Sequence, residues 1–536
     1  MDAIVKRAHE AANAWAAIPS ERRREVLLAV ANEMSNRRAV AIATLRVEAN
    51  KVAAEADTEV SEAIDFARYY AEQSVALGRI VAASFEPLGA VVITSPWNFP
   101  YAIAAGGALA ALAAGNAVIL KPAPSVPGCA ALVAECCWAA GVPRDVLQLA
   151  ACDDGEVSRS LIANELTDAV ILTGSFETAE LFHSWRPSLQ LFGETSGKNA
   201  LVITPHADVD LAVSDLVKSA FGHAGQKCSA ASLAICVGDI YTSKRFRRQL
   251  VDATQSLRVG LADNPRTSLS QLAGAPSKKL LNAFTKLDSD EKWLIKPKLL
   301  DADENLWSPG IKLGVKPGSS FHLTECFGPV LGLMPASSVA DAVDIQNGSE
   351  YGLTAGIHTL DSSEIDFWQD RVAAGNLYVN RPITGAIVQR QPFGGWKRSS
   401  VGPGAKAGGP NYLTQFGDWK NVGLPTASRG LTQPLSEHLS LLRPHLNSVE
   451  TTALETAARS DSYWWTREFS QEHDPAGLIH ETNVLRYRPF SELHVRLTDP
   501  ALLFDLARTS IAAKLAGVPL RVSAMSRSGL LGLCGE

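Results

Sequence analysis

The stretch GHAGQKCSAAS, residues 222–232, places one cysteine among small residues and beside a lysine. A cysteine thiolate attacks carbonyl carbon readily, and the thioester that follows is easily hydrolysed. The small neighbours Gly225, Ser229 and Ala230 leave room for a substrate to approach the sulfur of Cys228. The competing interpretation is that Cys228 is inert apolar filler, and we expect that role for the rest of the eight cysteines.

A second candidate binding element stands at a predicted strand-to-helix turn, LTGSFETAE, residues 172–180. The chain has no GxGxxG dinucleotide fingerprint. The free N–H groups and the dipole at a helix start can hold a pyrophosphate without three glycines, and Gly174 and Ser175 stand at that position. The alternative is that Ser175 is an ordinary helix cap.

Five short motifs occur along the chain in a fixed order. They are SPWNFP (residues 95–100), KPAP (121–124), GETSGKN (193–199), GQKCSA (225–230) and ECFGPV (325–330). In this order they resemble the NAD(P)-dependent aldehyde dehydrogenase superfamily, and the resemblance runs from near the start of the chain to about Val422. It implies oxidation of an aldehyde by hydride transfer to a nicotinamide cofactor.

Two later stretches narrow the resemblance. GNLYVNRPITGAIVQRQPFGG (residues 375–395) and KAGGPNYL (406–413) resemble L-glutamate γ-semialdehyde dehydrogenase, also called pyrroline-5-carboxylate dehydrogenase, and in particular the dehydrogenase half of bifunctional proline utilization A. The tail with HETNVLRYRP is similar to the C-terminal accessory domain of the longer members of that group. Since the chain starts later than is typical and has no proline dehydrogenase half, we expect a fragment or a truncated frame, functionally coupled to a proline dehydrogenase.

The resemblance assigns three residues to catalysis. Cys228 corresponds to the nucleophile that makes the aldehyde carbon tetrahedral. The side-chain amide of Asn98 and the N–H of Cys228 would hold the developing oxyanion. Glu194 would activate water for deacylation, with a raised pKa in a pocket of uncharged neighbours. The alternatives are a turn-forming asparagine and a surface glutamate.

The resemblance also assigns the cofactor contacts. They are Lys121 with the adenine ribose, Glu325 and Phe327 at the nicotinamide ribose, Gly174 and Ser175 at the pyrophosphate, and Ser95, Pro96 and Trp97 along the cofactor path. Two positions depart from the family: Pro124 stands where a ribose-binding glutamate is usual, and Ala179 stands where glycine is common. The resemblance implies NAD as the cofactor. Because the missing carboxylate is a group that would repel a 2′-phosphate, NADP is left open.

The substrate contacts follow from the narrower resemblance. The N–H groups of Thr384, Gly385 and Ala386 would anchor the α-carboxylate of an amino-acid substrate. Ser229 would supply a hydroxyl beside the nucleophile, and Phe393 an apolar wall for the methylene groups. The alternative is that the three-residue loop is an ordinary tight turn that binds no ligand.

These residues need rigid elements to hold them, and the chain predicts two consecutive α/β series. Residues 2–74 are predicted helical from apolar spacing at three- and four-residue intervals. Residues 87–120 carry no charge, and GAVVITSP, AIAAGGALAALAAG and NAVILKP indicate a strand, a helix and a strand of a buried parallel sheet rather than a membrane span. A second series follows Glu194. Ligands in such sheets gather at the carboxyl ends of the strands.

The expected fold class is α/β, an aldehyde dehydrogenase fold with a Rossmann-like cofactor domain, an α/β catalytic domain, a small oligomerisation arm and a small C-terminal α/β domain. The expected boundaries are 1–192 for the NAD-binding domain with a hairpin arm near 75–85, 193–380 for the catalytic domain, 381–422 for the substrate-anchor loop and the return to the arm, and 423–536 for a linker and an incomplete accessory domain. The return strand is expected near residues 414–422. Since family members associate through such an arm, we expect a homo-oligomer, a dimer.

Composition limits the classes of partner. A net charge of −6 over 536 residues gives no attraction to nucleic acid or to an anionic membrane. The eight cysteines have no regular spacing and the sequence shows no secretory leader, which indicates a reducing cytoplasm rather than a disulfide framework. No metal-ligand cluster stands out among the 11 histidines, so we expect no metal site. The expected partner is a small-molecule substrate.

The expected function is NAD-dependent oxidation of L-glutamate γ-semialdehyde, from pyrroline-5-carboxylate, to L-glutamate through a Cys228 thioester, the second step of proline catabolism. Three alternatives remain. The same chemistry on another semialdehyde, such as succinate semialdehyde, is the nearest. A module without activity, kept for assembly, would explain Pro124 and Ala179. A cysteine hydrolase would use Cys228 with His223, five residues before it.

Overall fold

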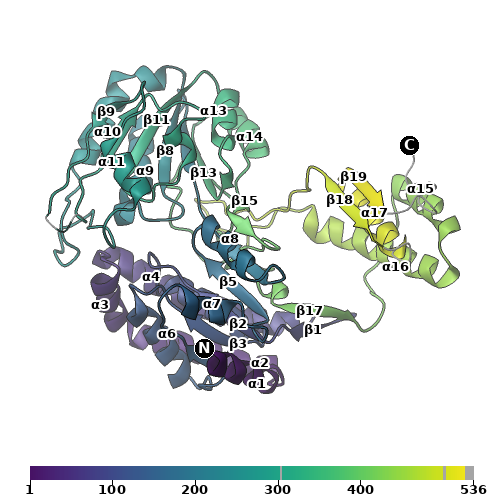
Figure 1. Cartoon of the computed structure of the whole chain (residues 1–536). Helices are drawn as coiled ribbons and strands as arrows, with labels where there is room; N and C mark the ends of the chain where they lie inside the picture. Colours follow the sequence, from purple (N-terminus) through teal and green to yellow (C-terminus); the bar gives the residue numbers. More distant parts are fainter. Residues whose placement is uncertain (302, 304, 499–502, 525–536) are drawn as a thin grey trace. The chain divides into compact units, whose positions relative to one another are not determined.

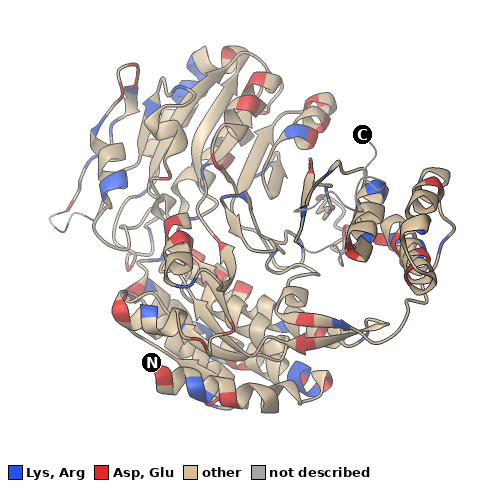
Figure 2. Cartoon of the chain, turned by 45° about the vertical axis from the view of Figure 1, so that its right-hand side comes forward, with Lys and Arg blue, Asp and Glu red and all other residues tan. Residues whose placement is uncertain are grey.

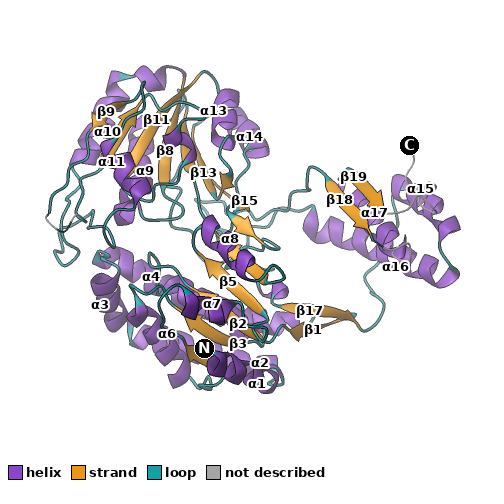
Figure 3. Cartoon of the chain, in the orientation of Figure 1, coloured by secondary structure: helices purple, strands orange, loops and turns teal. Residues whose placement is uncertain are grey.

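The computed structural model describes residues 1–301, 303, 305–498 and 503–524. The chain divides into two compact units (Figure 1). The first is built from Met1–Leu77 and Pro87–Asp418, and the second from Gly78–Glu86 and Trp419–Glu536. The first unit holds two large β-sheets with helices packed around them, which confirms the predicted α/β fold class (Figure 3).

The first sheet has six strands in the order β16-β6-β5-β2-β3-β4. Its strands are β2 (Ala90–Thr94), β3 (Ala117–Lys121), β4 (Leu147–Leu149), β5 (Ala169–Thr173), β6 (Gln190–Glu194) and β16 (Ser400–Val401). Neighbouring strands pair in parallel, except that β16 is antiparallel to β6. Every residue of β2 and β3 is buried, as expected for strands covered on both faces.

Helices cover this sheet on both faces. The helices of this part are α1 (Asp2–Ala16), α2 (Ser20–Asn36), α3 (Arg38–Glu48), α4 (Ala53–Leu77), α5 (Ala102–Ala113), α6 (Pro127–Ala139), α7 (Glu156–Ile162) and α8 (Phe176–Trp185). Alternate strand residues such as Val92, Ile119 and Val170 form one core with α1, α7 and α8. On the opposite face α5 lies so close that a Cβ on Gly107 would be 2.8 Å from the Cγ2 of Ile93. The uncharged stretch is therefore a strand, a small-residue helix and a strand, and the described helices include none that is long and apolar enough to cross a bilayer.

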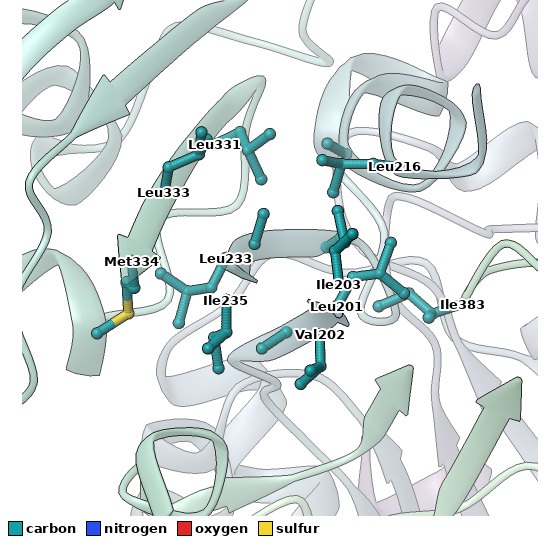
Figure 4. Packing of buried hydrophobic residues seen from close by; sticks show 14 of the residues in the cluster. Leu201, Val202, Ile203, Leu216, Leu233, Ile235, Leu331, Leu333, Met334 and Ile383 are labelled. Atoms are coloured by element: carbon teal, nitrogen blue, oxygen red, sulfur yellow. The ribbon is translucent and has the colours of Figure 1, made fainter. Parts of the chain in front are cut away.

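The second sheet has seven strands in the order β14-β13-β7-β8-β11-β10-β9, and all neighbouring pairs are parallel except β10 with β9. Its strands are β7 (Asn199–Ile203), β8 (Ala231–Val237), β9 (Lys292–Ile295), β10 (Gly310–Leu313), β11 (Val330–Ala336), β13 (Thr354–His358) and β14 (Asn376–Val379). Its helices are α9 (Val209–Phe221), α10 (Lys244–Gln255), α11 (Lys278–Thr285), α12 (Ser320–Leu323), α13 (Val339–Asn347) and α14 (Ser362–Arg371), and the shorter elements of the unit are η1 (Gly222–Gly225), η2 (Gly238–Thr242), β12 (Tyr351–Gly352), β15 (Trp396–Lys397) and η3 (Leu413–Gln415). Apolar strand residues, among them Leu201, Leu233 and Leu331, pack with Leu216 of α9 and with Ile383 (Figure 4).

Charged side chains lie mainly on helices and loops, and the strands of the large sheets are mostly uncharged (Figure 2). Among the described strands of the six-stranded sheet, only Lys121 and Glu194 are charged, and each is the last residue of its strand. Because the carboxyl ends of parallel strands meet at one edge, these two charges share the edge at which such sheets bind ligands.

The second unit contains a two-stranded arm and an α/β tail. Its elements are β1 (Ala83–Pro87), β17 (Gly417–Asn421), α15 (Gln433–Leu442), η4 (Arg443–His445), α16 (Ser448–Trp464), η5 (Trp465–Phe469), β18 (Leu493–Leu497), α17 (Leu503–Ala516) and β19 (Leu520–Ala524). Strands β1 and β17 pair with each other, and β18 pairs in parallel with β19. The stretch 75–85 begins as helix, because α4 continues to Leu77 with Val75 on its buried face. The expected domain boundaries stay a prediction.

One buried side chain ties strands of the second sheet to the nucleophile loop. Asn199 is the first residue of β7 and is 2% exposed. Its Nδ2 donates to the carbonyl oxygens of Cys228 at 2.7 Å and of Ala230 at 3.1 Å, and its Oδ1 accepts the N–H of Thr354 at 3.0 Å. The amide therefore sets the position of the Cys228 backbone relative to β7, β8 and β13.

Replacing Asn199 by alanine removes three hydrogen bonds and leaves their buried backbone partners unpaired. With a net contribution of about 1 kcal/mol for each bond, we expect Asn199→Ala to lower the free energy of unfolding by about 3 kcal/mol. Urea unfolding followed by tryptophan fluorescence measures the loss.

Asn347→Ala is the matched control, because the Asn347 amide also joins two backbone groups, the carbonyl oxygen of Arg371 and the N–H of Ala373. Both variants should lose stability, but only Asn199→Ala should change the rate at which iodoacetamide alkylates Cys228. Equal alkylation rates in the two variants would contradict the positioning role of Asn199.

Candidate active site

A cavity of about 880 Å³ opens at the carboxyl ends of the first sheet's strands. The last residues of β2, β3, β5 and β6, which are Thr94, Lys121, Thr173 and Glu194, all lie in its wall. Parallel α/β sheets bind their ligands at this edge. The wall also contains the predicted catalytic residues Cys228 and Asn98, the predicted cofactor residues Ser95, Pro96, Trp97, Lys121, Gly174, Ser175, Glu325 and Phe327, and the predicted substrate residue Phe393.

The Cys228 loop leaves α9 through a left-handed turn. His223, Ala224 and Gly225 have φ angles of 51°, 52° and 67°. Glycine is needed at position 225, because a Cβ there would lie 2.5 Å from the carbonyl oxygen of Gly328. The turn therefore seats the loop against the ECFGPV motif and leaves the Cys228 side chain partly exposed to the cavity.

The Cys228 thiol is held in its neutral form in this cavity. Burial raises its pKa to about 12, and the nearby carboxyl groups of Glu325 and Glu194 add to the shift. The thiolate is the nucleophile. The thiol must therefore lose its proton before it attacks a carbonyl carbon, either to a base or because a nearby cation lowers its pKa.

Asn98 lies in the turn that follows β2 and is 6% exposed. One N–H of its amide donates to the carbonyl oxygen of Gln226 at 3.0 Å, two residues before Cys228. Among the described residues no acceptor is found for the second amide N–H. That N–H is therefore available to an oxyanion formed at Cys228.

A buried ion pair that sequence reasoning missed supports this turn. The side chains of Lys51 and Glu59 are fully buried and form an ion pair. Glu59 Oε1 also accepts the N–H groups of Tyr101 at 2.8 Å and Ala102 at 3.1 Å, at the start of α5. The Nζ of Lys51 lies 3.6 Å from the centroid of the Phe99 ring. The signal for Glu59 is its place on the apolar stripe of α4, because acidic residues are rarely buried without a partner.

The Glu194 carboxyl has a pKa near neutrality. Burial raises this pKa to about 8, while the ammonium of Lys406 and the N–H of Gly395, 3.3 Å from Oε2, act in the opposite direction. The Nζ of Lys406 donates to the carbonyl oxygens of Gly375 at 2.6 Å and Gly394 at 2.8 Å, and burial lowers the pKa of this lysine to about 8. A carboxyl group in this state is suited to general base catalysis.

The cation beside Glu194 is not the one that is nearest in sequence. Lys198, four residues after Glu194, has its Nζ 4.2 Å from the centroid of the Phe321 ring, and burial lowers its pKa. Lys406 stands in the KAGGPNYL motif, to which sequence reasoning gave no chemical role. Only the fold brings it to Glu194.

The residues at the other strand ends fit a dinucleotide. Lys121 is buried, and its Nζ forms an ion pair with Asp154 at 2.8 Å. Ser175 accepts the N–H of Thr178 at 3.1 Å, which is the ordinary cap of α8, and it also lines the cavity. The hydroxyl of Ser95 is buried in the wall and has no hydrogen-bond partner among the described residues. A wall with an unpaired buried hydroxyl, a buried lysine and a helix start is suited to a polar ligand.

Glu325 and Phe327 hold the loop beside the nucleophile. Glu325 Oε1 accepts the N–H of Gly197 at 2.8 Å, and burial raises the pKa of this carboxyl. Phe327 has a left-handed φ of 60° and packs edge-on against Trp97, with ring centroids 5.5 Å apart. Ala179, which departs from the family pattern, is 1% exposed in the core under α8, so its methyl group is accommodated.

Four predicted substrate residues lie outside the cavity wall. Ser229 is 8% exposed, and its carbonyl oxygen accepts the hydroxyl of Thr354 at 3.3 Å. Thr384, Gly385 and Ala386 form a loop in which Thr384 is 6% exposed, and a Cβ built on Gly385, which has a φ of 80°, would have no atom within 4 Å. The described residues provide no acceptor for the N–H groups of this loop. Its role as an anchor stays a prediction.

His223 does not act as a base toward Cys228 in this structure. Its ring is buried and packs edge-on against Phe99, with centroids 6.1 Å apart, and burial holds its pKa well below the ordinary value. No hydrogen bond between His223 and Cys228 is found in the described part of the chain. This arrangement disfavours a cysteine hydrolase.

The chain matches known protein sequences over most of its length. The sequence model described as "Aldehyde dehydrogenase family" matches residues 1–422. A 1-pyrroline-5-carboxylate dehydrogenase of Geobacillus sp. is 34% identical over 428 residues, which cover 76% of this chain and 82% of that protein. The 1-pyrroline-5-carboxylate dehydrogenase of Bacillus subtilis is 34% identical over 423 residues, which cover 75% and 81%.

Solved structures share the fold. Proline Utilization A from Corynebacterium freiburgense has a TM-score of 0.90 and 46% identity over 98% of this chain, which spans only 53% of that protein. The 1-pyrroline-5-carboxylate dehydrogenase from Thermus with bound NAD has a TM-score of 0.73 and 31% identity over 78% of this chain and 84% of that one. A family match over residues 1–422, relatives of this similarity and a common fold show that the chain belongs to the aldehyde dehydrogenase family, and so is an NAD(P)-dependent oxidoreductase.

Proposed function

We propose that this enzyme oxidises L-glutamate γ-semialdehyde, the open form of pyrroline-5-carboxylate, to L-glutamate, with NAD as the hydride acceptor. The observation that carries the proposal is one cavity that holds a cysteine, a buried amide and a carboxyl group of raised pKa: Cys228, Asn98 and Glu194. The substrate class is supported by the relatives named 1-pyrroline-5-carboxylate dehydrogenase, which match 76% and 75% of the chain.

Cys228 begins the reaction by adding to the aldehyde carbon. A sulfur electron pair forms the C–S bond, the carbonyl π pair moves to oxygen, and the thiol proton would pass to the carboxylate of Glu325, whose charge acts on the thiol. The oxyanion would accept hydrogen bonds from the Asn98 amide and the Cys228 N–H. These donors act on a charge that is absent from the free aldehyde, so they stabilise the transition state more than the bound substrate.

A nicotinamide cofactor held in this cavity would supply the acceptor for the hydride that leaves the tetrahedral carbon. Lys121 would bind the adenine ribose, Glu325 the nicotinamide ribose, and the turn at Gly174 and Ser175 the pyrophosphate. The unpaired hydroxyl of Ser95 would gain a partner there. On loss of the hydride, the oxyanion would re-form the carbonyl group, and the acyl group would remain on Cys228 as a thioester.

Glu194 would then complete the reaction as a general base. It takes a proton from water while the water oxygen forms a bond to the thioester carbon, and the Asn98 amide again holds the oxyanion. Collapse of this second tetrahedral carbon breaks the C–S bond and releases L-glutamate. The proton on Glu194 then passes to the departing sulfur, which returns Cys228 to its neutral thiol form and Glu194 to its carboxylate.

Selectivity for an amino-acid semialdehyde would come from the loop at Thr384, Gly385 and Ala386. Its N–H groups have no acceptors among the described residues, so they are free to donate to a substrate carboxylate. Phe393 lines the cavity and would contact the methylene groups, and Ser229 would add a hydroxyl near the nucleophile.

We also propose a cytoplasmic homodimer that is coupled to a proline dehydrogenase. Exposed apolar residues of the second unit, among them Val81, Val422 and Leu424, favour a partner subunit at the arm formed by β1 and β17. The similarity to Proline Utilization A over 98% of this chain supports the coupling.

NADH formation with pyrroline-5-carboxylate and with succinate semialdehyde tests the substrate class. We expect kcat/KM to be at least about tenfold higher for pyrroline-5-carboxylate, because an α-carboxylate held by N–H groups gains charge-assisted hydrogen bonds. A preference for succinate semialdehyde would refute the assignment. A folded chain that reduces no dinucleotide with either compound would indicate a module without activity.

The same assay tests the nucleophile. Cys228→Ser should lower kcat by about 10³-fold or more, because it removes the group that forms the thioester. Cys152→Ser is the control, since Cys152 is a partly exposed cysteine outside the cavity wall. Comparable losses in the two variants would contradict the role of Cys228.

Glu194 sets the expected pH dependence of turnover. Because the pKa of its carboxyl is raised to about 8, most of it is protonated at pH 7, whereas base catalysis requires the deprotonated form. The value of kcat should therefore rise with pH above neutrality, as the buried pair of Glu194 and Lys406 loses a proton, and then level off. Steady-state NADH formation between about pH 6 and pH 10 checks this profile.

Glu194→Gln separates the two half-reactions. The variant should retain the first burst of NADH, a single equivalent per site, but lose steady-state turnover by about 10²- to 10⁴-fold. Glu180→Gln, on the exposed face of α8, is the matched control and should behave as the natural enzyme. An unchanged rate and pH profile in Glu194→Gln would rule out the assignment.

A further inference from the structure

Asp154 lies beside Lys121 at the β4 edge of the first sheet. Strand β3 ends at Lys121, and its neighbour β4 ends at Leu149. The loop after β4 brings Asp154 into the cavity wall, where Oδ1 accepts a hydrogen bond from the Nζ of Lys121 at 2.8 Å. The lysine side chain is 6% exposed and the aspartate side chain 76%, so the carboxylate is the more accessible member of the pair.

Among the carboxyl groups in the described part of the cavity wall, Asp154 is the one beside Lys121. The other carboxyl groups in the wall are Glu177, Glu194 and Glu325. Glu194 and Glu325 act on the nucleophilic thiol, and Glu177 is paired with Lys279 at 2.7 Å. The only acidic side chain beside the buried lysine, among the described residues of the wall, is therefore Asp154.

The KPAP turn provides no carboxylate of its own. Ala123 and Ser125 line the cavity, and Pro124 between them has no polar side-chain atom. A ribose presents hydroxyl donors, and a carboxylate offers only acceptors. In parallel α/β sheets that bind dinucleotides, an acidic residue takes the ribose 2′-hydroxyl and a cationic residue takes a 2′-phosphate.

We propose that Asp154 selects NAD over NADP by accepting hydrogen bonds from the adenine ribose, in place of the carboxylate that Pro124 lacks. The inference rests on the proposed function, because it assigns a contact to the cofactor of that reaction. Lys121 is oriented by Asp154 and donates to the same ribose.

The ion pair explains why one residue acts on both cofactors. Asp154 neutralises Lys121, so the pair offers no net charge to a 2′-phosphate, and the accessible carboxylate repels it. Without the carboxylate, Lys121 becomes an unpaired cation that attracts the phosphate. The charge of Asp154 therefore favours NAD and opposes NADP.

Isothermal titration calorimetry with NAD⁺ and with NADP⁺, in the absence of aldehyde, tests the inference on the full chain. For Asp154→Asn we expect the Kd for NAD⁺ to rise by about tenfold, since a hydrogen bond to a charged group is lost. The Kd for NADP⁺ should fall, so that the ratio of the two constants changes by more than about tenfold.

Asp153→Asn is the matched control, because it removes the same charge from an adjacent exposed side chain outside the cavity wall. Its ratio of Kd values should equal that of the natural chain. The inference is overturned if the natural chain binds NADP⁺ as tightly as NAD⁺, or if both variants give the same ratio. Because no aldehyde is present, a wrong substrate assignment would leave these constants unchanged, and failure of the inference would leave the Cys228 chemistry intact.

Discussion

The amide of Asn199 is the interaction on which the geometry of the site depends. It uses both amide hydrogens and its oxygen on backbone groups, and so fixes the Cys228 carbonyl to the first residue of β7. Close backbone contacts also confine the loop on two sides. A Cβ on Gly197 would lie 2.7 Å from the carbonyl oxygen of Cys228, and a Cβ on Gly225 would lie 2.5 Å from the carbonyl oxygen of Gly328. Because the loop is confined in the folded protein, little further conformational entropy is lost when the sulfur is positioned against a substrate.

The six-stranded sheet separates two tasks with its two charged residues. Glu194 is the last residue of β6 and lies near the thiol. Burial raises the pKa of its carboxyl, so the group can take up and release a proton close to neutral pH. Lys121 ends β3 near the edge of the sheet, where Asp154 balances its charge. The catalytic residue Glu194 and the predicted cofactor residue Lys121 are therefore separated in the sheet by strands β5 and β2.

Features that lie inside one short motif could be predicted from the sequence. The uncharged run of residues 87–120 indicated the strand–helix–strand unit around α5. The small neighbours of Cys228 and the proline-bounded turn of Asn98 marked these two as candidate site residues. Their supports come from distant segments and could not be predicted: Lys406 reaches Glu194 only through the fold, and Glu59 holds the Asn98 turn from α4. Local spacing carries no information on such pairs, because each partner alone is compatible with a solvated surface charge.

The high pKa of the Cys228 thiol has a consequence for the survival of the enzyme. Oxidants such as peroxide attack thiolates, and the damage begins with a sulfenic acid that can proceed to irreversible forms. Because its pKa is raised far above 7, only a small fraction of the resting sulfur is a thiolate at neutral pH. The burial that keeps the thiol neutral, together with the nearby carboxyl groups, thus also shields the sulfur from oxidative inactivation between turnovers.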